Sequence, residues 1–267
     1  MALNPPLTQW AGQVVWLVGA STGIGRALAG ALHARGAQVL VSARPSAALT
    51  QVAHDLPGCE LVPLDVTDAQ AVRAACAQCV QRHGRLDVVV LCAGTYAPLR
   101  ATHFVLATAL HHLTVNLSGA YHLLDAVLPV LLAQARTHPP GSASGPGHLA
   151  LVSSVAGYRA LPQALAYGPT KAGLIHLAQG LHFDLAPLGL GVSLINPGFV
   201  DTPLTAHNPF PMPALQTPEQ AAQAILRGWA RGAFEIHFPR RFSRVLKLLA
   251  WLPTEAYERL IHRLTGL

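Results

Sequence analysis

Residues 13–26 are QVVWLVGASTGIGR, an apolar run that leads directly into a glycine-rich turn. The run at 13–18 predicts a buried strand, and the stretch 25–35 has the periodicity of an amphipathic helix. Between them, glycines let the backbone bend tightly and approach a ligand, and the helix start offers unpaired N–H groups to a phosphate. The spacing G-x-x-x-G-x-G differs from the general dinucleotide turn G-x-G-x-x-G. Alone, the stretch therefore fits either a phosphate-binding turn or a closely packed helix cap.

The rest of the chain repeats this alternation of strand and helix. Further apolar runs lie at 37–43, 59–64, 87–92, 148–154 and 190–196, and helical patterns lie at 68–83, 108–135 and 165–186. Such βαβ repetition predicts an α/β fold with a parallel sheet, helices on both faces and ligands at the carboxyl ends of the strands. No linker divides residues 1–267, so we expect one domain. Its core would span about 11–205, and 206–267 would form a substrate lid and C-terminal helices. The segment 138–148 predicts a surface loop.

Composition excludes several classes of protein. With 51% hydrophobic and 11% charged residues, the chain is too apolar to be disordered. The most apolar helical stretch, 121–133, contains Asp125 and Pro129, which favours a buried helix over a membrane span. The N-terminus has no secretory signal pattern, so we expect a cytoplasmic protein without a nucleic-acid partner. Cysteines and histidines lack metal-ligand spacing: Cys76 and Cys79 fall inside a helical pattern, and His103, His111, His112, His176 and His182 are interpreted as surface or packing residues. We expect no metal site.

One of only two lysines in the chain, Lys171, follows Tyr167 by four residues in AYGPTKAG. On a helix, this spacing puts both side chains on one face. Bringing a tyrosine pKa from about 10 to near 7 costs roughly 4 kcal/mol. A positive charge about 5 Å away, at an effective dielectric of about 20, supplies roughly 3 kcal/mol. The pair therefore predicts a general acid or base, although by itself it also fits two neighbouring surface residues.

Several motifs occur together in one order along the chain. They are the glycine turn, Asn116, Ser153-Ser154, Tyr167-x-x-x-Lys171 and Asn196-Pro197-Gly198. In this order and spacing, residues 11–205 resemble the short, single-domain branch of the short-chain dehydrogenase/reductase family. The resemblance implies a Rossmann-type, doubly wound, three-layer α/β/α fold that binds NAD(H) or NADP(H). It also implies a catalytic group of Asn116, Ser154, Tyr167 and Lys171.

Within that group, the resemblance assigns each residue a role. Ser154, rather than Ser153, stands at the family's usual distance before Tyr167 and would hydrogen-bond the substrate oxygen. Tyr167 would be the general acid or base, Lys171 would lower its pKa and bind the nicotinamide ribose, and Asn116 would hold a water on the proton path. The implied cofactor site comprises Gly19, Ser21, Thr22, Gly23, Ile24, Gly25, Asp65, Val66, Ala93, Gly94, Tyr167, Lys171, Pro197, Gly198, Val200 and Thr202. Val18 and Leu91 replace polar family residues, which we interpret as apolar repacking.

The end of the second strand indicates which nicotinamide cofactor is used. An NAD site places an acidic side chain there for the ribose 2′-OH, whereas an NADP site offers an arginine to the 2′-phosphate. Here Ala43 occupies the acidic position, Arg44 follows it, and no Asp or Glu occurs from Gln38 through Thr50. A solvated Arg44 is the alternative. We predict that NADP(H) is preferred over NAD(H).

The substrate is predicted only by class. Segments that border it by family position are Thr95 to Pro98, Ala156 to Pro162 and Phe199 to Pro213, with Arg159, Asp201, His207 and Asn208 as the polar exceptions. Their apolar composition favours a lipophilic ketone, aldehyde or alcohol. The alternatives are a 3-oxoacyl-thioester reductase and a catalytically silent NADP(H)-binding sensor or scaffold. The resemblance also implies a homo-oligomer.

The C-terminus concentrates positive charge. Eight of the eighteen basic residues lie between Arg227 and Arg263, interleaved with apolar ones, and Pro253 predicts a division into two amphipathic helices. Three interpretations stay open. The apolar face could pack on the protein's own fold. It could instead lie peripherally on an anionic membrane or close a lipid-substrate pocket. The basic face could also meet an acidic carrier protein or the phosphates of an acyl-CoA.

Overall fold

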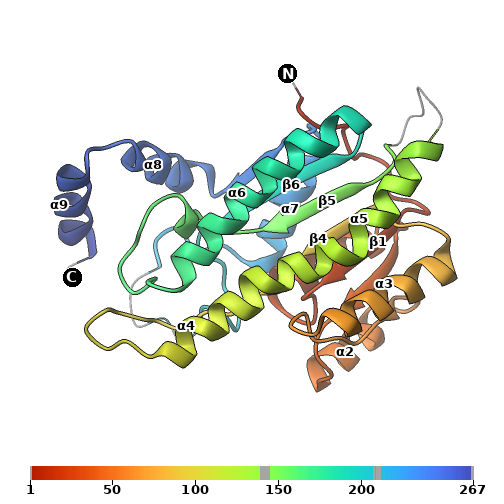
Figure 1. Ribbon diagram of the computed structural model, residues 1–267, viewed down its shortest axis with the longest axis horizontal. Helices are drawn as coiled ribbons and strands as arrows, with labels where there is room; N and C mark the ends of the chain where they lie inside the picture. The colour runs from red at the N-terminus through yellow and green to blue at the C-terminus, as the bar shows by residue number, and fades with distance from the viewer. Residues whose placement is uncertain (1, 139–144, 207, 209–211, 266–267) are drawn as a thin grey trace.

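Seven strands form one parallel sheet in the computed structural model, which describes residues 2–138, 145–206, 208 and 212–265 (Figure 1). The strand order is β3-β2-β1-β4-β5-β6-β7. The strands are β1 (Val14–Val18), β2 (Gln38–Ser42), β3 (Glu60–Leu61), β4 (Val88–Leu91), β5 (His148–Val152), β6 (Gly191–Pro197) and β7 (Glu235–Phe238). From β1 the chain winds outward through β2 and β3, then returns to place β4 on the other side of β1. Such a reversal creates a crevice at the carboxyl ends of β1 and β4.

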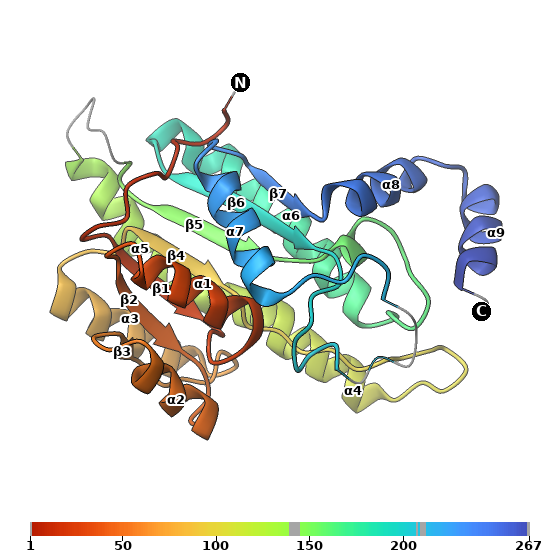
Figure 2. The same ribbon diagram turned by 180° about the vertical axis from the view of Figure 1, so that it is seen from behind.

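Helices cover both faces of the sheet, as the predicted three-layer α/β/α fold requires (Figures 1 and 2). One core cluster joins the sheet to α3 (Ala69–His83), α5 (Gly119–Thr137) and α6 (Tyr167–Leu185). The other joins it to α1 (Gly23–His33), α2 (Ala47–Asp55) and α7 (Pro218–Trp229). Because both faces are covered, all five residues of β1 are buried, as its continuous apolar sequence predicts.

The sheet extends beyond the predicted core of 11–205. β7 pairs with β6 in parallel, from Leu194 opposite Glu235 to Pro197 opposite Phe238. Helix α7 precedes it and begins with a capping box between Thr217 and Gln220. Its apolar face packs into the same core cluster as α1. The Rossmann-type core therefore continues to Phe238, and only part of 206–267 lies outside it. Of the expected lid and the 138–148 loop, residues 207, 209–211 and 139–144, and with them His207, lie outside the described residues.

The predicted helix 108–135 is divided into three parts. These are α4 (Leu106–His112), a π-helical turn η1 (Leu113–Ser118) and α5. The combined span Leu106–Thr137 is long and apolar enough to cross a membrane by length and composition. However, Leu123, Val127 and Leu131 of α5 are buried in the core beneath the sheet. Packing thus accounts for the apolar face of α5, whereas Leu106 and Leu110 of α4 are exposed.

The chain ends in two helices that project from the body, which we call the C-terminal arm (Figures 1 and 2). They are α8 (Arg240–Ala250) and α9 (Thr254–Thr265), separated at Pro253 as predicted. Arg159, in the loop that follows β5, connects the C-terminal arm to the rest of the protein. Its guanidinium donates hydrogen bonds to the carbonyls of Ala250 (3.1 Å) and Leu252 (2.5 Å) and lies 4.2 Å from the centroid of the Tyr257 ring. Tyr257 in turn donates to the carbonyl of Ala160 (2.7 Å).

Candidate active site

A cleft of about 730 Å³ lies at the carboxyl ends of the strands. Its lining includes every residue predicted to bind the cofactor, brought together from six separate segments of the chain. They are Gly19, Ser21, Thr22, Gly23, Ile24, Gly25, Arg44, Asp65, Val66, Ala93, Gly94, Tyr167, Lys171, Pro197, Gly198, Val200 and Thr202. Their individual roles stay predictions. Their convergence follows from the topology, since parallel strands deliver their following loops to one edge.

The glycine turn is fixed by close backbone contacts. Gly19 has a φ of +89°, and a Cβ on it would lie 2.3 Å from the amide nitrogen of Ala93, which follows β4. A Cβ on Gly25 would lie 2.5 Å from the carbonyl oxygen of Gly19. Thr22, immediately before α1, makes no side-chain cap. The amides of the first turn of α1 therefore face the cleft without a side-chain partner, which suits the pyrophosphate of a dinucleotide.

At the far side of this turn, the segment after β2 is electropositive. Arg44 is exposed, lines the cleft and forms no ion pair within the part of the chain that the structure describes. Ser46, also on the cleft, caps α2 by accepting a hydrogen bond from Leu49 N–H (3.2 Å). Asp65 is the acidic neighbour across the cleft. Its carboxylate accepts hydrogen bonds from the backbone and hydroxyl of Thr67, and these bonds and the charge of Arg44 hold the pKa of Asp65 below its usual value.

The predicted catalytic pair, Tyr167 and Lys171, lies in the first turns of α6. Tyr167 is the first residue of the helix, and Lys171 is buried one turn later with its Nζ 5.5 Å from the centroid of the Tyr167 ring. Burial raises the pKa of Tyr167 to about 12, although a hydrogen bond with the Ser154 side chain acts in the opposite direction. Burial also lowers the pKa of Lys171 to about 8. In the protein alone, the pKa of Tyr167 is thus shifted upward, in the direction opposite to the one predicted from the charge of Lys171.

The two adjacent serines have different partners. Ser153 is buried, and its hydroxyl donates to the carbonyl of Lys171 (2.7 Å), so it holds α6 against β5. Ser154 accepts a hydrogen bond from Ala156 N–H (3.1 Å) and is the one that reaches Tyr167. Ser153 lines the cleft, whereas Ser154 is not among its lining residues, so the choice of Ser154 for the catalytic group stays a prediction.

Asn116 lies in the π-helical turn and is fully buried. Its Oδ1 accepts from Thr95 N–H (2.7 Å), and its Nδ2 donates to the carbonyl of Thr95 (3.0 Å) and to the hydroxyl of Thr170 (3.1 Å). The side chain therefore ties the loop after β4 to α6, close to Lys171. Its role in holding a water on the proton path stays a prediction.

Two aromatic side chains pack beside Tyr167, and one of them, Tyr96, belongs to the segment predicted to border the substrate. Tyr96 packs edge-on against the Tyr167 ring, with the centroids 5.1 Å apart. His112, interpreted from sequence as a packing residue, is buried with its ring 6.4 Å from that of Tyr167 and accepts a hydrogen bond from Ala97 N–H (3.0 Å). His112 precedes Asn116 by one helical turn, and that spacing is a signal that could have placed it at the site. Among the described residues, no three His, Cys, Asp or Glu side chains gather where they could hold a metal ion.

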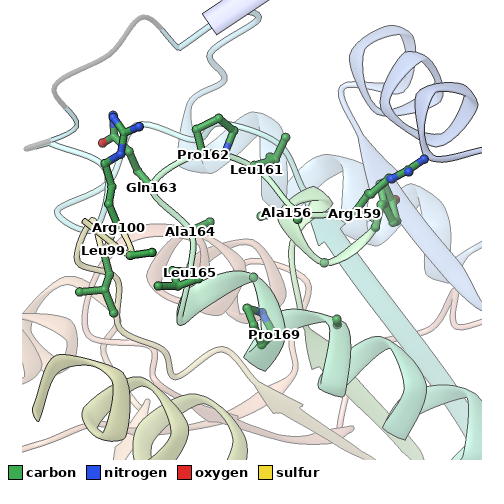
Figure 3. Close-up of a pocket in the computed structure, with 16 residues that line it drawn as sticks. Leu99, Arg100, Ala156, Arg159, Leu161, Pro162, Gln163, Ala164, Leu165 and Pro169 are labelled. Atoms are coloured by element: carbon green, nitrogen blue, oxygen red, sulfur yellow. The ribbon is translucent and has the colours of Figure 1, made fainter. Parts of the chain in front are cut away.

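A second hollow, about 460 Å³ and mostly apolar, is lined by the loop between β5 and α6 (Figure 3). It shares no lining residue with the cleft. Leu161, Pro162 and Leu165 line it from the loop, and Pro169 lines it from α6. The predicted substrate-bordering segment 156–162 therefore faces this groove rather than the cofactor cleft. Arg159 at its edge turns toward the C-terminal arm.

The doubly wound sheet, the glycine turn at its switch point and the grouped Ser154, Tyr167 and Lys171 define a nicotinamide-dependent oxidoreductase. The chain matches the short chain dehydrogenase family over residues 13–209. It is 33% identical over 252 residues to an uncharacterized oxidoreductase of Myxococcus xanthus (strain DK1622), which covers 93% of this chain and 96% of that protein. An uncharacterized oxidoreductase of Staphylococcus aureus (strain USA300) is 33% identical over 217 residues, covering 80% and 89%. The chain therefore belongs to the short-chain dehydrogenase/reductase family and is an NAD(P)-dependent oxidoreductase.

Solved structures have the same architecture. A short-chain dehydrogenase from Burkholderia cenocepacia J2315 in complex with NADP superposes with a TM-score of 0.80 at 24% identity, covering 95% of this chain and 99% of that chain. A short-chain dehydrogenase from Streptomyces avermitilis gives a TM-score of 0.75 at 26% identity, covering 89% and 92%.

Proposed function

We propose that the protein interconverts a lipophilic ketone or aldehyde and its alcohol, using NADP(H), with Tyr167 as general acid and base. The proposal rests on the arrangement of Ser154 and Lys171 around Tyr167. Its side chain lines the cleft, is hydrogen-bonded with Ser154 and lies one helical turn before the buried Lys171. When bound, the nicotinamide supplies or accepts the hydride.

The pKa directions favour a defined order of proton movement. With its pKa raised to about 12, Tyr167 stays protonated at neutral pH and can donate its proton to a carbonyl oxygen. Lys171, whose pKa is about 8, is mostly charged at pH 7 and stabilises the tyrosinate that remains. Ser154 hydrogen-bonds the same substrate oxygen, and Asn116 supports delivery of the replacement proton. The reverse steps serve alcohol oxidation.

The preference for NADP(H) rests on Arg44. Arg44, which forms no ion pair with another described residue, and the hydroxyl of Ser46 line the part of the cleft where we expect the 2′-phosphate of NADP, and the carboxylate of Asp65 is engaged by Thr67. An arginine pairs with a phosphate through two parallel hydrogen bonds. The Burkholderia cenocepacia structure was solved with NADP, which supports the same assignment by similarity.

The substrate class rests on the walls around Tyr167. The ring of Tyr96 packs edge-on against Tyr167, and the neighbouring groove is mostly apolar. A 3-oxoacyl thioester would meet the same catalytic group, so this chemistry is the second candidate. A silent NADP(H) sensor is less well supported because Asn116, Ser154, Tyr167 and Lys171 are all retained.

An NADPH-oxidation screen tests the proposal. The panel would contain steroid, fatty-acyl, aromatic and quinone carbonyls and a 3-oxoacyl thioester, and each compound would be assayed in parallel with Tyr167→Phe. We expect at least one lipophilic carbonyl to be reduced by the wild type and not by the variant. NADPH binding by both proteins, with no compound reduced faster by the wild type, would instead support the sensor.

A further inference from the structure

The C-terminal arm has one face that the protein's own fold leaves uncovered. On α8, Val245 is 52% exposed and Leu248 71%, and Trp251 at the end of the helix is 91% exposed. These three large apolar side chains form an exposed apolar surface on one short helix. Packing in the core of a monomer does not account for such a surface.

The opposite face of α8 is already in use. Phe242 packs against Phe199, with ring centroids 5.8 Å apart, and Ser243 is fully buried. Lys247 forms an ion pair with Glu235 and lies 5.3 Å from the centroid of the Tyr158 ring. Lys247, counted in the sequence analysis with the basic face, is therefore an anchor of α8 on the body and not part of the exposed surface.

The exposed face combines these apolar side chains with arginines in a definite arrangement. Arg240, Arg241 and Arg244 occupy the half of α8 next to the body, and the apolar side chains occupy the half that leads to the outer end of the arm (Figures 1 and 2). Spacing of four, four and three residues puts Arg240, Arg244, Leu248 and Trp251 along one side of the helix. We call these six side chains the arm surface: Arg240, Arg241, Arg244, Val245, Leu248 and Trp251.

Positive charge at the base of the arm surface is uncompensated. None of its three arginines forms an ion pair with another described residue. Arg227 and Arg231 lie close enough that their charge and that of Arg240 act on one another, and burial together with these neighbours lowers the pKa of Arg231. From Arg227 to Arg263 there are eight basic residues and three acidic ones. Like charges held together in this way attract an anionic counterpart.

We propose that the arm surface binds the surface of an anionic lipid bilayer. Val245, Leu248 and Trp251 would enter the boundary between headgroups and acyl chains, where a tryptophan is favoured. Arg240, Arg241 and Arg244 would lie behind them on the lipid phosphates. Apolar insertion distinguishes this partner from a soluble polyanion, which would meet the arginines and leave the three apolar side chains in water.

Charge also decides between a bilayer and a second copy of the chain. The protein has 18 Lys and Arg against 12 Asp and Glu, for a net charge of +6. Its carboxylates include Asp55, Asp87, Asp125, Glu60 and Glu235, which are already paired with basic side chains of the same chain. Contact with a second copy would therefore bring the arm surface against another basic molecule, whereas an anionic leaflet matches it.

Trp251 gives the experiment a built-in reporter. Of the four tryptophans, Trp10, Trp16 and Trp229 are buried, and only Trp251 is exposed. Vesicles of phosphatidylcholine with and without phosphatidylserine would be mixed with the full chain and floated on a density gradient. We expect co-flotation only with phosphatidylserine, release at high salt, and a blue shift of tryptophan emission that brominated acyl chains quench.

Matched variants separate the arm surface from overall charge and hydrophobicity. Arg241→Gln/Arg244→Gln should lower binding roughly 30-fold, about fivefold for each arginine. Arg35→Gln/Arg136→Gln removes the same charge from exposed sites elsewhere and should leave binding within twofold. Trp251→Ser should weaken binding roughly tenfold and abolish the emission shift. Phe183→Ser, which removes another highly exposed aromatic ring, should do neither.

The proposal is overturned by flotation that is absent, by equal flotation with both lipid compositions, or by equal losses in the arm and control variants. It is also overturned if Trp251→Ser converts a lipid-free dimer into a monomer, since the arm surface would then belong to a second copy. Thermal unfolding of each variant confirms that it is folded, and all of these outcomes are independent of whether a substrate is known.

Discussion

Lys171 lies one helical turn beyond Tyr167, with its Nζ 5.5 Å from the centroid of the phenol ring and hydrogen-bonded to the carbonyl of Val152 (3.0 Å). The Lys171 amine therefore lies near the Tyr167 ring, but its hydrogen bond is to the last residue of β5. Burial moves the two pKa values in opposite directions, to about 12 for Tyr167 and about 8 for Lys171. Tyr167 is thereby kept protonated at neutral pH, whereas Lys171 loses its positive charge as the pH rises through about 8.

The first prediction is a pH profile for carbonyl reduction. As the pH rises through about 8, Lys171 loses its charge, the tyrosinate is no longer stabilised, and kcat/KM should fall toward tenfold per pH unit. Lys171→Arg keeps the charge and should show no such fall up to pH 10, even if its maximum rate is lower. A wild-type profile that is flat between pH 7 and 10 would contradict the assigned role of Lys171.

The second prediction is that Lys171 lowers the stability of the fold. A pKa lowered from 10.5 to about 8 corresponds to about 3 kcal/mol at neutral pH, from which the hydrogen bond to Val152 recovers about 1 kcal/mol. Lys171→Met should therefore raise the free energy of unfolding at pH 7 by about 2 kcal/mol. Above about pH 8 the folded wild type releases this proton, whereas the unfolded chain retains it until about pH 10.5, so wild-type stability rises and the advantage of the variant should shrink across that range. Denaturant unfolding at several pH values measures it, and a variant less stable at pH 7 would refute the prediction.

Third, Tyr167→Phe should reduce turnover by roughly 10²- to 10⁴-fold, because it removes the proton donor and leaves the ring packing in place. NADPH binding, followed by the fluorescence of the cofactor, should change by less than a few-fold. Tyr96→Phe is the matched control, since its ring also packs in this cluster and its hydroxyl has no proposed role. Equal losses in both variants would indicate that the cluster acts through packing rather than through the Tyr167 hydroxyl.

Fourth, Arg44→Ala should weaken NADP(H) binding by roughly 10- to 100-fold, the contribution of a charge-assisted hydrogen bond to phosphate. NAD(H) has no 2′-phosphate and should be affected much less. The measurement is the ratio of kcat/KM for the two cofactors, and Arg35→Ala in the exposed turn that follows α1 is the control. If the wild type already uses both cofactors equally, Arg44 does not select between them.

The fifth prediction concerns the attachment of the C-terminal arm. Arg159→Ala removes the donor to two carbonyls at the end of α8 and the cation over the Tyr257 ring. We expect amide hydrogen exchange in residues 240–265 to increase at least tenfold while the sheet stays protected, since each lost contact is worth about 1 kcal/mol. Arg100→Ala at the opposite end of the apolar groove should leave the arm unchanged. Uniformly faster exchange throughout the protein would mean that Arg159 stabilises the whole fold instead.

Much of the fold follows from local sequence. The strands at β1, β2, β4, β5 and β6 are predicted because residues buried on both faces must be apolar without interruption. The same reasoning applies to Val18 and Leu91, two apolar strand residues that stand where the family has polar ones. These two residues are register partners in β1 and β4 and share one core cluster, as apolar repacking requires.

The members of the cleft are also determined by sequence, since each follows a predicted strand or stands at fixed spacing on one helix. The pKa values of the site residues, in contrast, are not determined by the sequence alone. Whether Lys171 governs the pKa of Tyr167 depends on how deeply both are buried and on the carbonyl of Val152, which approaches from another strand. Desolvation depends on every surrounding atom, and spacing along a chain does not contain that information.

Only the tertiary structure decided which residues of the last quarter belong to the core and which are free. Short β7 becomes a strand through pairing with β6, and Lys247 is separated from the neighbouring arginines because Glu235 of β7 lies beside it. The amphipathic pattern of α8 predicts a helix, but it does not determine which side of the helix packs against the rest of the protein. That choice depends on contacts between residues distant in sequence, such as Arg159 with Ala250, and it leaves Leu248 and Trp251 exposed to solvent.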